Sequence, residues 1–442
     1  MSQKLLVLGA GPKALALAAK AAVLRMLDVE NVPDVIAIDR RYVAANWDGA
    51  NGFTDGLQLL GTPPEKDVGF PYRSSVWVQG RDLNREVNDK MLAYSWYRYK
   101  VLEDRQEPYS TWIDRGLPQP THGEWGAYLK WVAAEARLNV KTGEVIRIDL
   151  SEAPLGWRVI CETEDGVEEV RGDGLVISGP GASPSRTQPE RCFDPISFWN
   201  SLDKSFSGSR GLDICVVGAG ETAAAAVAAL LSCLGEACRI FVVSPHSFIY
   251  SRGESFLENR VFTDPGTWDE VSAKDRDEFI RRTDRSVFSQ AVQEKINLSH
   301  IEVKCLPGRV DLTAVKQSAK GVQISVLYDN QKPRKYEFDY VLDAASLNRL
   351  WFLDLLSAEA RQRLEQVLHD LAVDEGLHFT SEELLSRKML ETRIDFSLRV
   401  RSFKPSLHLP MLSALRRGPG FPNLSCLGLL SDRILKYYVD GS

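Results

Sequence analysis

Two short stretches of the chain, residues 9–14 and 218–223, have the pattern G-x-G-x-x-A. In this pattern the first glycine permits a tight turn, the second lets backbone amides approach a pyrophosphate, and the small third residue lets a helix pack closely. The phosphates then lie at the helix N-terminus, where free N–H groups and the helix dipole favour anions. The pattern predicts two dinucleotide sites, with cofactor-binding residues Gly9, Gly11, Pro12, Ala14, Gly218, Gly220, Thr222 and Ala223.

The first site needs a strand before the turn and a helix after it. Residues 4–8 are a short apolar run, and residues 14–27 are rich in Ala and Leu without an internal breaker. A second apolar run, residues 35–38, ends at Asp39, where a carboxylate can accept hydrogen bonds from a ribose diol. These features predict a βαβ unit around the first turn.

The second turn has the same context, because residues 213–217 and 239–243 read as strands and residues 221–234 as an Ala-rich helix. The second strand ends without an acid. This absence favours a 2′-phosphate and therefore NADPH over NADH. Alternatively, the proline that follows simply ends the strand. The candidate partners of the phosphate are Ser244, His246 and Arg252.

Composition excludes several other classes of protein. The 442 residues carry a net charge of −6 and are 44% apolar, which is typical of a globular protein and gives no basic surface for nucleic acid or an anionic membrane. We expect no membrane span, because no run of eighteen apolar residues occurs. The seven cysteines are scattered, which favours a reducing, cytoplasmic location. The six histidines lack the spacing of metal ligands, so we expect no metal site.

Two dinucleotide sites, the first at the N-terminus, are typical of a flavoprotein that binds FAD and is reduced by NAD(P)H. A disulfide reductase would also need a C-x4-C pair beside the flavin. Cys233 and Cys238 have that spacing but follow the second motif, so we interpret them as part of a buried helix. A flavoprotein that reduces oxygen and oxygenates a substrate is the favoured class.

Six segments, in the same order along the chain, resemble the flavin-dependent N-hydroxylating monooxygenases, the ornithine and lysine N-hydroxylases of siderophore biosynthesis. The resemblance covers nearly the whole chain. The segments that carry it, each with the family's own motif in parentheses, are residues 9–12 (GxGP), 47–49 with 57–58 (W-H-x-G and M-Q), 66–68 (K-D-L), 124–131 (E-F-x-x-Y-x-x-W), 255–262 with 283–287 (S-x-F-x-N-E-x-F and T-N-Y-S-V), and 423–435 (N-F and G-L-S-D-x-L-L).

The resemblance implies FAD- and NADPH-dependent N-hydroxylation of a primary amine of an amino acid or a derived metabolite, through a C4a-hydroperoxyflavin. It implies that Gln58, Asn259 and Ser431 are catalytic. It also implies that Lys66 meets the substrate carboxylate and that Asn259 contacts both NADP and the amine. Further cofactor contacts are implied for Trp47, Gln58, Ser255 and Leu429.

Three departures from the family pattern bear on the substrate. Asp284 stands where the family has an Asn that donates to the substrate carboxylate; an ionised carboxylate only accepts, so it would attract an ammonium instead. The A-T-G-Y loop is replaced by residues 344–347, and Arg260 replaces a Glu. Two alternatives therefore stay open: a related flavin monooxygenase that oxidises another nitrogen, a sulfur or a carbonyl centre, and a catalytically degenerate flavoprotein subunit.

The expected fold class is α/β, with two Rossmann-like domains for FAD and NADPH and a small helical part for the substrate. We assign residues 1–207 to the first part of the FAD domain and residues 208–345 to an inserted NADPH domain, whose segment 267–297 is helical and faces the substrate. Residues 346–442 form a helical segment on the substrate side and then return to the FAD domain. The expected partners are a small-molecule amine, O2 and further copies of the chain in a dimer or tetramer.

Overall fold

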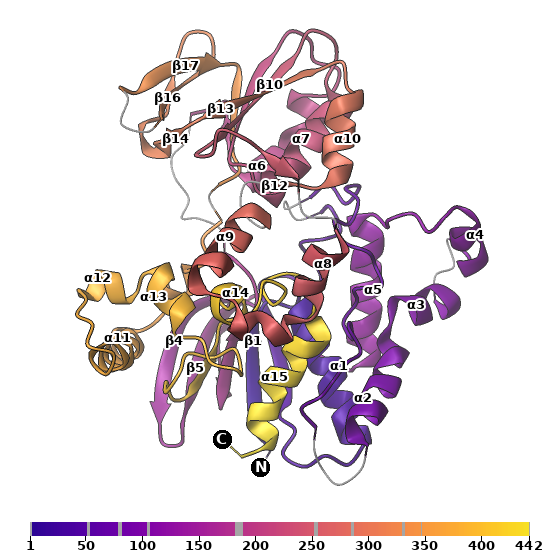
Figure 1. The fold of residues 1–442 in the computed structure, drawn as a ribbon, viewed down its shortest axis with the longest axis vertical. Helices are drawn as coiled ribbons and strands as arrows, with labels where there is room; N and C mark the ends of the chain where they lie inside the picture. Colours follow the sequence, from indigo (N-terminus) through magenta and orange to yellow (C-terminus); the bar gives the residue numbers. More distant parts are fainter. Residues whose placement is uncertain are drawn as a thin grey trace.

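The computed structural model describes residues 2–50, 54–77, 82–103, 107–181, 189–251, 255–283, 287–328, 332–345 and 347–441. The chain forms two α/β units, one above the other in Figure 1, with helices α8 (Phe256–Thr263) and α9 (Ala273–Thr283) between them. Each unit contains a parallel sheet of five strands. The predicted α/β class with two Rossmann-like sheets is confirmed.

The lower sheet takes strands from both ends of the chain. Its order is β19-β7-β1-β2-β3. The strand bounds are β1 (Lys4–Leu8), β2 (Asp34–Asp39), β3 (Asn139–Thr142), β7 (Gly174–Ile177) and β19 (Ser406–His408). Helix α1 (Pro12–Met26) packs against α5 (His122–Glu135) and α15 (Leu427–Val439). The C-terminal segment therefore completes the domain that the N-terminus begins, and both termini lie close together at its base (Figure 1).

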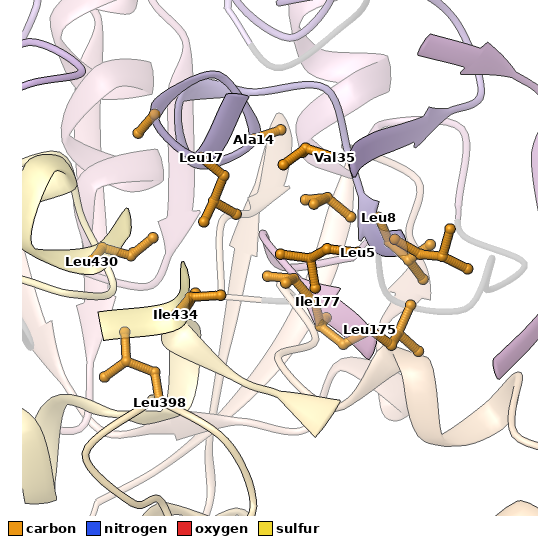
Figure 2. Close-up of a cluster of buried hydrophobic side chains, with 14 of the residues drawn as sticks. Leu5, Leu8, Ala14, Leu17, Val35, Leu175, Ile177, Leu398, Leu430 and Ile434 are labelled. Carbon is orange, nitrogen blue, oxygen red and sulfur yellow. The ribbon is translucent and has the colours of Figure 1, made fainter. Parts of the chain in front are cut away.

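The core of the lower unit consists of the apolar faces of the first strand, the first helix and the last helix. Figure 2 shows their side chains converging with those of β7. Each of these residues is at most 2% exposed: Leu5, Leu8, Ala14, Leu17, Leu175, Ile177, Leu430 and Ile434. The small side chain of Ala14 lies against the sheet, which is the packing that the third position of the glycine motif requires.

The upper sheet has the order β13-β10-β9-β18-β8. Its strands are β8 (Cys192–Phe193), β9 (Asp213–Val217), β10 (Arg239–Ser244), β13 (Glu302–Pro307) and β18 (Tyr340–Asp343), and its helices are α6 (Pro195–Ser205), α7 (Glu221–Cys233) and α10 (Gln290–Leu298). Strand β8 and helix α6 precede residue 208 and yet pack in this unit. The domain boundary predicted between residues 207 and 208 stays a prediction. The upper sheet also contains residues that precede this boundary.

Smaller elements surround the two sheets. A three-stranded antiparallel meander extends the lower unit, a four-stranded antiparallel sheet extends the upper one, and β11 pairs with β12. Their bounds are β4 (Glu144–Glu152), β5 (Leu155–Thr163), β6 (Gly166–Gly172), β11 (Tyr250–Ser251), β12 (Val287–Phe288), β14 (Arg309–Val310), β15 (Lys316–Gln317), β16 (Val322–Leu327) and β17 (Arg334–Phe338). The remaining helices are α2 (Leu83–Met91), α3 (Trp96–Leu102), α4 (Tyr109–Asp114), α11 (Ala358–Val373), α12 (Ser381–Leu384), α13 (Arg387–Thr392), α14 (Ala414–Arg417) and the 3-10 turns η1 (Leu92–Tyr94), η2 (Pro265–Glu270), η3 (Leu312–Ala314), η4 (Trp351–Asp354) and η5 (Pro410–Leu412).

A buried ion pair joins the first helix to the last. Lys20 donates from Nζ to Asp432 Oδ1 over 2.7 Å, and the two side chains are 1% and 2% exposed. The same carboxylate oxygen accepts from Trp77 Nε1 at 2.9 Å, and Lys20 also donates to Ser74 Oγ at 3.0 Å. These hydrogen bonds offset part of the desolvation of both charges, although the other carboxylate oxygen of Asp432, Oδ2, is buried without a hydrogen-bond partner among the described residues, and they join α15 to α1.

A second buried network lies at the C-terminal strand. His408 is fully buried; its Nδ1 is 2.8 Å from the Ser397 carbonyl and therefore donates, so its Nε2 accepts from Tyr438 Oη at 3.0 Å. Tyr438 in turn accepts from Ser406 Oγ at 2.7 Å. Burial lowers the pKa of His408 to about 3, because the charged ring would lose its hydration.

Asp432→Ala should destabilise the protein by about 3–5 kcal/mol, because it leaves the Lys20 ammonium buried without its partner. The double variant Lys20→Met, Asp432→Leu should lose less than Asp432→Ala alone. Denaturant unfolding measures both. Asp89→Ala is the matched control, since the Arg85–Asp89 pair is exposed and its loss should cost at most about 0.5 kcal/mol. Equal losses for Asp432→Ala and Asp89→Ala would contradict this role of the pair.

Acidification should weaken the fold through His408. The pKa of this side chain is about 3 in the folded state and about 6.5 in the unfolded chain. Below about pH 6.5 the unfolded chain therefore binds a proton that the folded protein does not bind, and the free energy of unfolding falls as the pH drops. His408→Gln keeps a donor and an acceptor but does not titrate. Its unfolding midpoint should therefore fall less between about pH 7 and about pH 5. The exposed His369→Gln should retain the pH dependence of the parent.

Candidate active site

A groove of about 770 Å3 opens along the carboxyl ends of the lower sheet. The first glycine motif, Asp39 and Trp47 line it, as predicted for a cofactor site. The opposite wall comes from residues 347–355 and from the C-terminal segment 422–424. This is the location at which open parallel sheets bind ligands, beyond the carboxyl ends of their strands.

The two glycines of the first motif have different structural roles. Gly9 has φ +98°, and a Cβ added to it would lie 2.8 Å from Ser178 Oγ, so the turn requires glycine. A Cβ on Gly11 would meet no protein atom within 4 Å. Gly11 caps α1, Pro12 opens the helix, and no side chain caps the first turn, which also lacks an acid. The space before Gly11 and the uncapped N–H groups fit the pyrophosphate of FAD.

Asp39 lies at the end of β2 and is half-buried in the groove wall. Its two oxygens accept from the backbone N–H groups of Ala10 and Arg41, at 2.9 and 3.0 Å. A carboxylate has about four acceptor positions, so two remain for a ribose diol. These bonds also hold the carboxylate beside the glycine turn.

The second glycine motif repeats this geometry and faces the same groove. Gly218 has φ +116°, and a Cβ added to it would lie 3.1 Å from the Ala344 backbone. A Cβ on Gly220, which caps α7, would meet nothing within 4 Å. Thr222, in the first turn of α7, lines the groove of the first motif. Thr222 is thus the residue of the second motif that reaches this groove, Glu221 adds an acid to the first turn of α7, and Ala223 is fully buried behind the second turn.

Two of the predicted 2′-phosphate partners, Ser244 and His246, lie together at the end of β10. Ser244 is fully buried, and its Oγ accepts from the His246 backbone N–H at 3.2 Å, so its hydroxyl lies inside the fold. His246 is half-buried and lines neither cavity. Arg252 lies outside the described residues. Ser244 therefore offers no exposed hydroxyl that could bind the 2′-phosphate of NADPH.

A second cavity, of about 470 Å3, lies beside the groove and contains two of the three predicted substrate-binding residues, Lys66 and Asn259. Arg73 and Arg260 add two more cations, and Asp264 adds one carboxylate, which lies 3.4 Å from Arg73. The excess of positive charge suits a ligand that carries a carboxylate. The Arg at 260, a departure from the family pattern, contributes to this excess.

The two cavities share a wall. Residues 422–424 line the groove, and the next residue, Ser425, lines the smaller cavity. A molecule bound beside Lys66 therefore lies next to a cofactor bound in the groove. This adjacency is what direct transfer of an atom from cofactor to substrate requires.

Several predicted residues lie outside both cavities. Gln58 donates from its side-chain amide to Asp55 Oδ2 at 3.1 Å. Ser255 caps α8 by accepting from the Glu258 N–H at 3.2 Å. Leu429 packs against the core, and Ser431 is fully buried and donates to the Gly428 carbonyl at 2.9 Å. The roles that the resemblance implied for these residues stay predictions. Asp284 lies outside the described residues.

The groove also contains residues that the sequence did not single out. His122 lines it and packs edge-on against Trp47, with ring centroids 5.0 Å apart. Burial lowers the pKa of His122 to about 4, so the ring is neutral at physiological pH. Lys13 also lines the groove; its position inside the glycine motif, between Gly11 and Ala14, is the one sequence feature that could have identified it. No sequence pattern marks His122 or Ser425.

Two dinucleotide folds that open on one groove, with a cationic substrate cavity alongside, define a flavoprotein that oxidises a small molecule. The comparisons specify the family. The model of the L-lysine 6-monooxygenase/L-ornithine 5-monooxygenase family matches residues 88–303. L-lysine N6-monooxygenase MbtG of Mycolicibacterium paratuberculosis is 41% identical over 98% of this chain and 94% of its own length. The MbtG enzyme of Mycobacterium tuberculosis is 40% identical over 98% and 95%.

Solved structures agree with this assignment. Lysine monooxygenase NbtG from Nocardia farcinica matches with a TM-score of 0.80 and 38% identity, over 98% of each chain. Ornithine N-hydroxylase KtzI of Kutzneria sp. 744 shares the fold, with a TM-score of 0.71 and 16% identity over 99% of each chain. The chain belongs to the L-lysine 6-monooxygenase/L-ornithine 5-monooxygenase family. It is a flavin-dependent N-hydroxylating monooxygenase that uses FAD and NADPH, which confirms the prediction.

Two further features, a metal-binding cluster and a membrane-spanning helix, are absent from the described residues. No three His, Cys, Asp or Glu side chains come together there as metal ligands. No helix in the same residues is both long and apolar enough to cross a membrane.

Gly11→Ala should abolish FAD retention without unfolding the chain, because the new methyl group meets no protein atom but occupies the space before the helix N-terminus. Gly220→Ala should retain FAD and raise the KM for NADPH at least about tenfold, for the same reason at the second helix. Flavin absorbance and NADPH kinetics measure the two effects. If both variants lost FAD equally, the assignment of one motif to each cofactor would be wrong.

Proposed function

We propose that this enzyme hydroxylates the side-chain N6 amine of L-lysine. The observation that carries the proposal is the cationic cavity of Lys66, Arg73 and Arg260 directly beside the cofactor groove. The relatives that are 40–41% identical over 98% of the chain are L-lysine N6-monooxygenases, which supports lysine as the substrate. Lysine has both groups that the cavity requires, a carboxylate at one end and an amine at the other.

In this mechanism the chain binds and orients both reactants. The uncapped N-terminus of α1 and Asp39 would hold FAD, and Gly220 and Thr222 at the start of α7 would bind NADPH. FAD, once reduced by NADPH, supplies the chemistry that activates O2 for transfer to an amine. Lys66 binds the substrate carboxylate, and the side-chain oxygen of Asn259 accepts a hydrogen bond from the amine.

The amine has to be neutral to attack oxygen, although free lysine has a side-chain pKa of about 10.4. The cations of Lys66, Arg73 and Arg260 disfavour a further positive charge in the same cavity and thereby lower the pKa of the bound amine. Asp264 offsets the charge of Arg73, with which it pairs at 3.4 Å, so the net positive charge of the cavity comes from Lys66 and Arg260. The cavity thus combines binding of the carboxylate with deprotonation of the amine.

The proposal includes two further points, the role of Asp284 and the assembly of the chain. Asp284 is predicted to attract an ammonium, which in lysine is the α-amino group. A homo-oligomer and a cytoplasmic location remain predictions from the sequence.

A substrate panel of L-lysine, L-ornithine and cadaverine tests the proposal. The product from L-lysine should be N6-hydroxylysine by mass spectrometry, with NADPH oxidation coupled to its formation. Lys66→Met should raise the KM for L-lysine at least about tenfold, because it removes a charge-assisted bond to the carboxylate. The KM for cadaverine, which lacks a carboxylate, should stay the same in this variant.

Lys90→Met, on an exposed face of α2, is the matched control and should change neither KM. An equal rise of both KM values in Lys66→Met would show that Lys66 does not bind the carboxylate. Oxidation of NADPH without hydroxylated lysine would refute lysine as the substrate.

A further inference from the structure

Lys13 is a buried cation in the wall of the cofactor groove, and a charged side chain is unusual in a buried position. The residue is 8% exposed. Its ammonium donates to the Pro422 carbonyl at 2.9 Å and to Met411 Sδ at 3.3 Å. Within the described part of the chain no carboxylate lies within ion-pair distance of it. A buried charge with such partners is costly unless a further group compensates it.

Other features near Lys13 increase this cost. Lys13 is the second residue of α1, where the helix dipole disfavours a cation. Burial, together with the nearby Arg349, lowers the pKa of Lys13 to about 8. The thiol of Cys426 is the neighbouring acid, but burial raises its pKa to about 12, so it stays neutral and provides no counter-charge. The protein alone leaves the ammonium uncompensated.

The position of the ammonium along the groove identifies the part of FAD that it meets. Its acceptor, Pro422, precedes Asn423 and Leu424, which line the groove, and Ser425, which lines the substrate cavity. Lys66 of that cavity also lies near Cys426. The ammonium thus lies at the end of the groove next to the substrate, where the reacting ring of the flavin belongs. The pyrophosphate belongs at Gly11 instead.

We propose that Lys13 stabilises the reduced, anionic isoalloxazine ring of bound FAD. Transfer of a hydride from NADPH brings two electrons and one proton to the ring, releases NADP+ and leaves the ring with one negative charge. A fixed cation beside the ring favours this state over the neutral oxidised ring. The bound cofactor then supplies the counter-charge that Lys13 lacks. This inference rests on FAD binding and is independent of the identity of the amine.

The test compares oxidised and reduced FAD on the holoenzyme. Lys13→Met should weaken the binding of reduced FAD at least tenfold more than that of oxidised FAD. For a two-electron couple this lowers the midpoint potential by at least about 29.6 mV. Equilibration with a reference dye measures the potential without turnover. Lys13→Gln, which keeps a donor for the Pro422 carbonyl but no charge, should show the same shift, and Lys13→Arg should restore the potential.

The controls separate this role from two others. Lys90→Met should leave the potential unchanged, and the unfolding midpoint of the apo-protein should not fall in Lys13→Met, because a buried methionine replaces an uncompensated charge. Equal weakening of both redox states would assign Lys13 to the pyrophosphate and overturn the proposal. An unchanged potential in both Lys13→Met and Lys13→Gln would also overturn it. Failure of lysine hydroxylation with an intact potential shift would refute only the proposed substrate.

Discussion

The architecture depends on the contact between the first helix and the last, centred on the buried ion pair of Lys20 and Asp432. The N-terminus of helix α1 lines the groove, so the position of this helix shapes the groove. Helix α15 follows directly on the segment of residues 422–425 that separates the groove from the substrate cavity. A pair of charges 412 residues apart therefore aligns the cofactor-binding turn with the wall that the substrate contacts.

Positive charge is concentrated where the ligands carry negative charge. The N-termini of α1 and α7 have no side-chain cap, and Lys13 adds an ammonium to the first. The substrate cavity adds Lys66, Arg73 and Arg260. The net charge of the chain is nevertheless −6, so the cationic sites are local and bind particular anions rather than any polyanion. His122, in contrast, is kept neutral by burial beside the groove.

The insertion of one dinucleotide-binding unit into another explains why two glycine motifs serve one reaction. Both motifs use a left-handed glycine at the turn and leave open space before the helix. Thr222 of the second unit lines the groove of the first, so the second glycine motif reaches the groove that the first motif lines. The substrate cavity then lies on the far side of residues 422–425. The reduction of the flavin by NADPH and the oxygenation of the substrate can therefore take place at the same flavin.

The sequence by itself determined both βαβ units, the two cofactor turns, the family and the pairing of Lys66 with Asn259 in one site. The βαβ units and the turns follow from short-range rules, since strand and helix periodicity and left-handed glycines act within about 30 residues. The family and the pairing of Lys66 with Asn259 follow instead from the resemblance of six segments to a known family. The tertiary structure alone decided which side chains reach the cavities. Ser425 lines the substrate cavity whereas Ser431 turns inward, Ser244 is buried, and Asp432 pairs with Lys20. Each of these outcomes depends on how α15 and β10 pack against distant segments, and no local pattern encodes that packing.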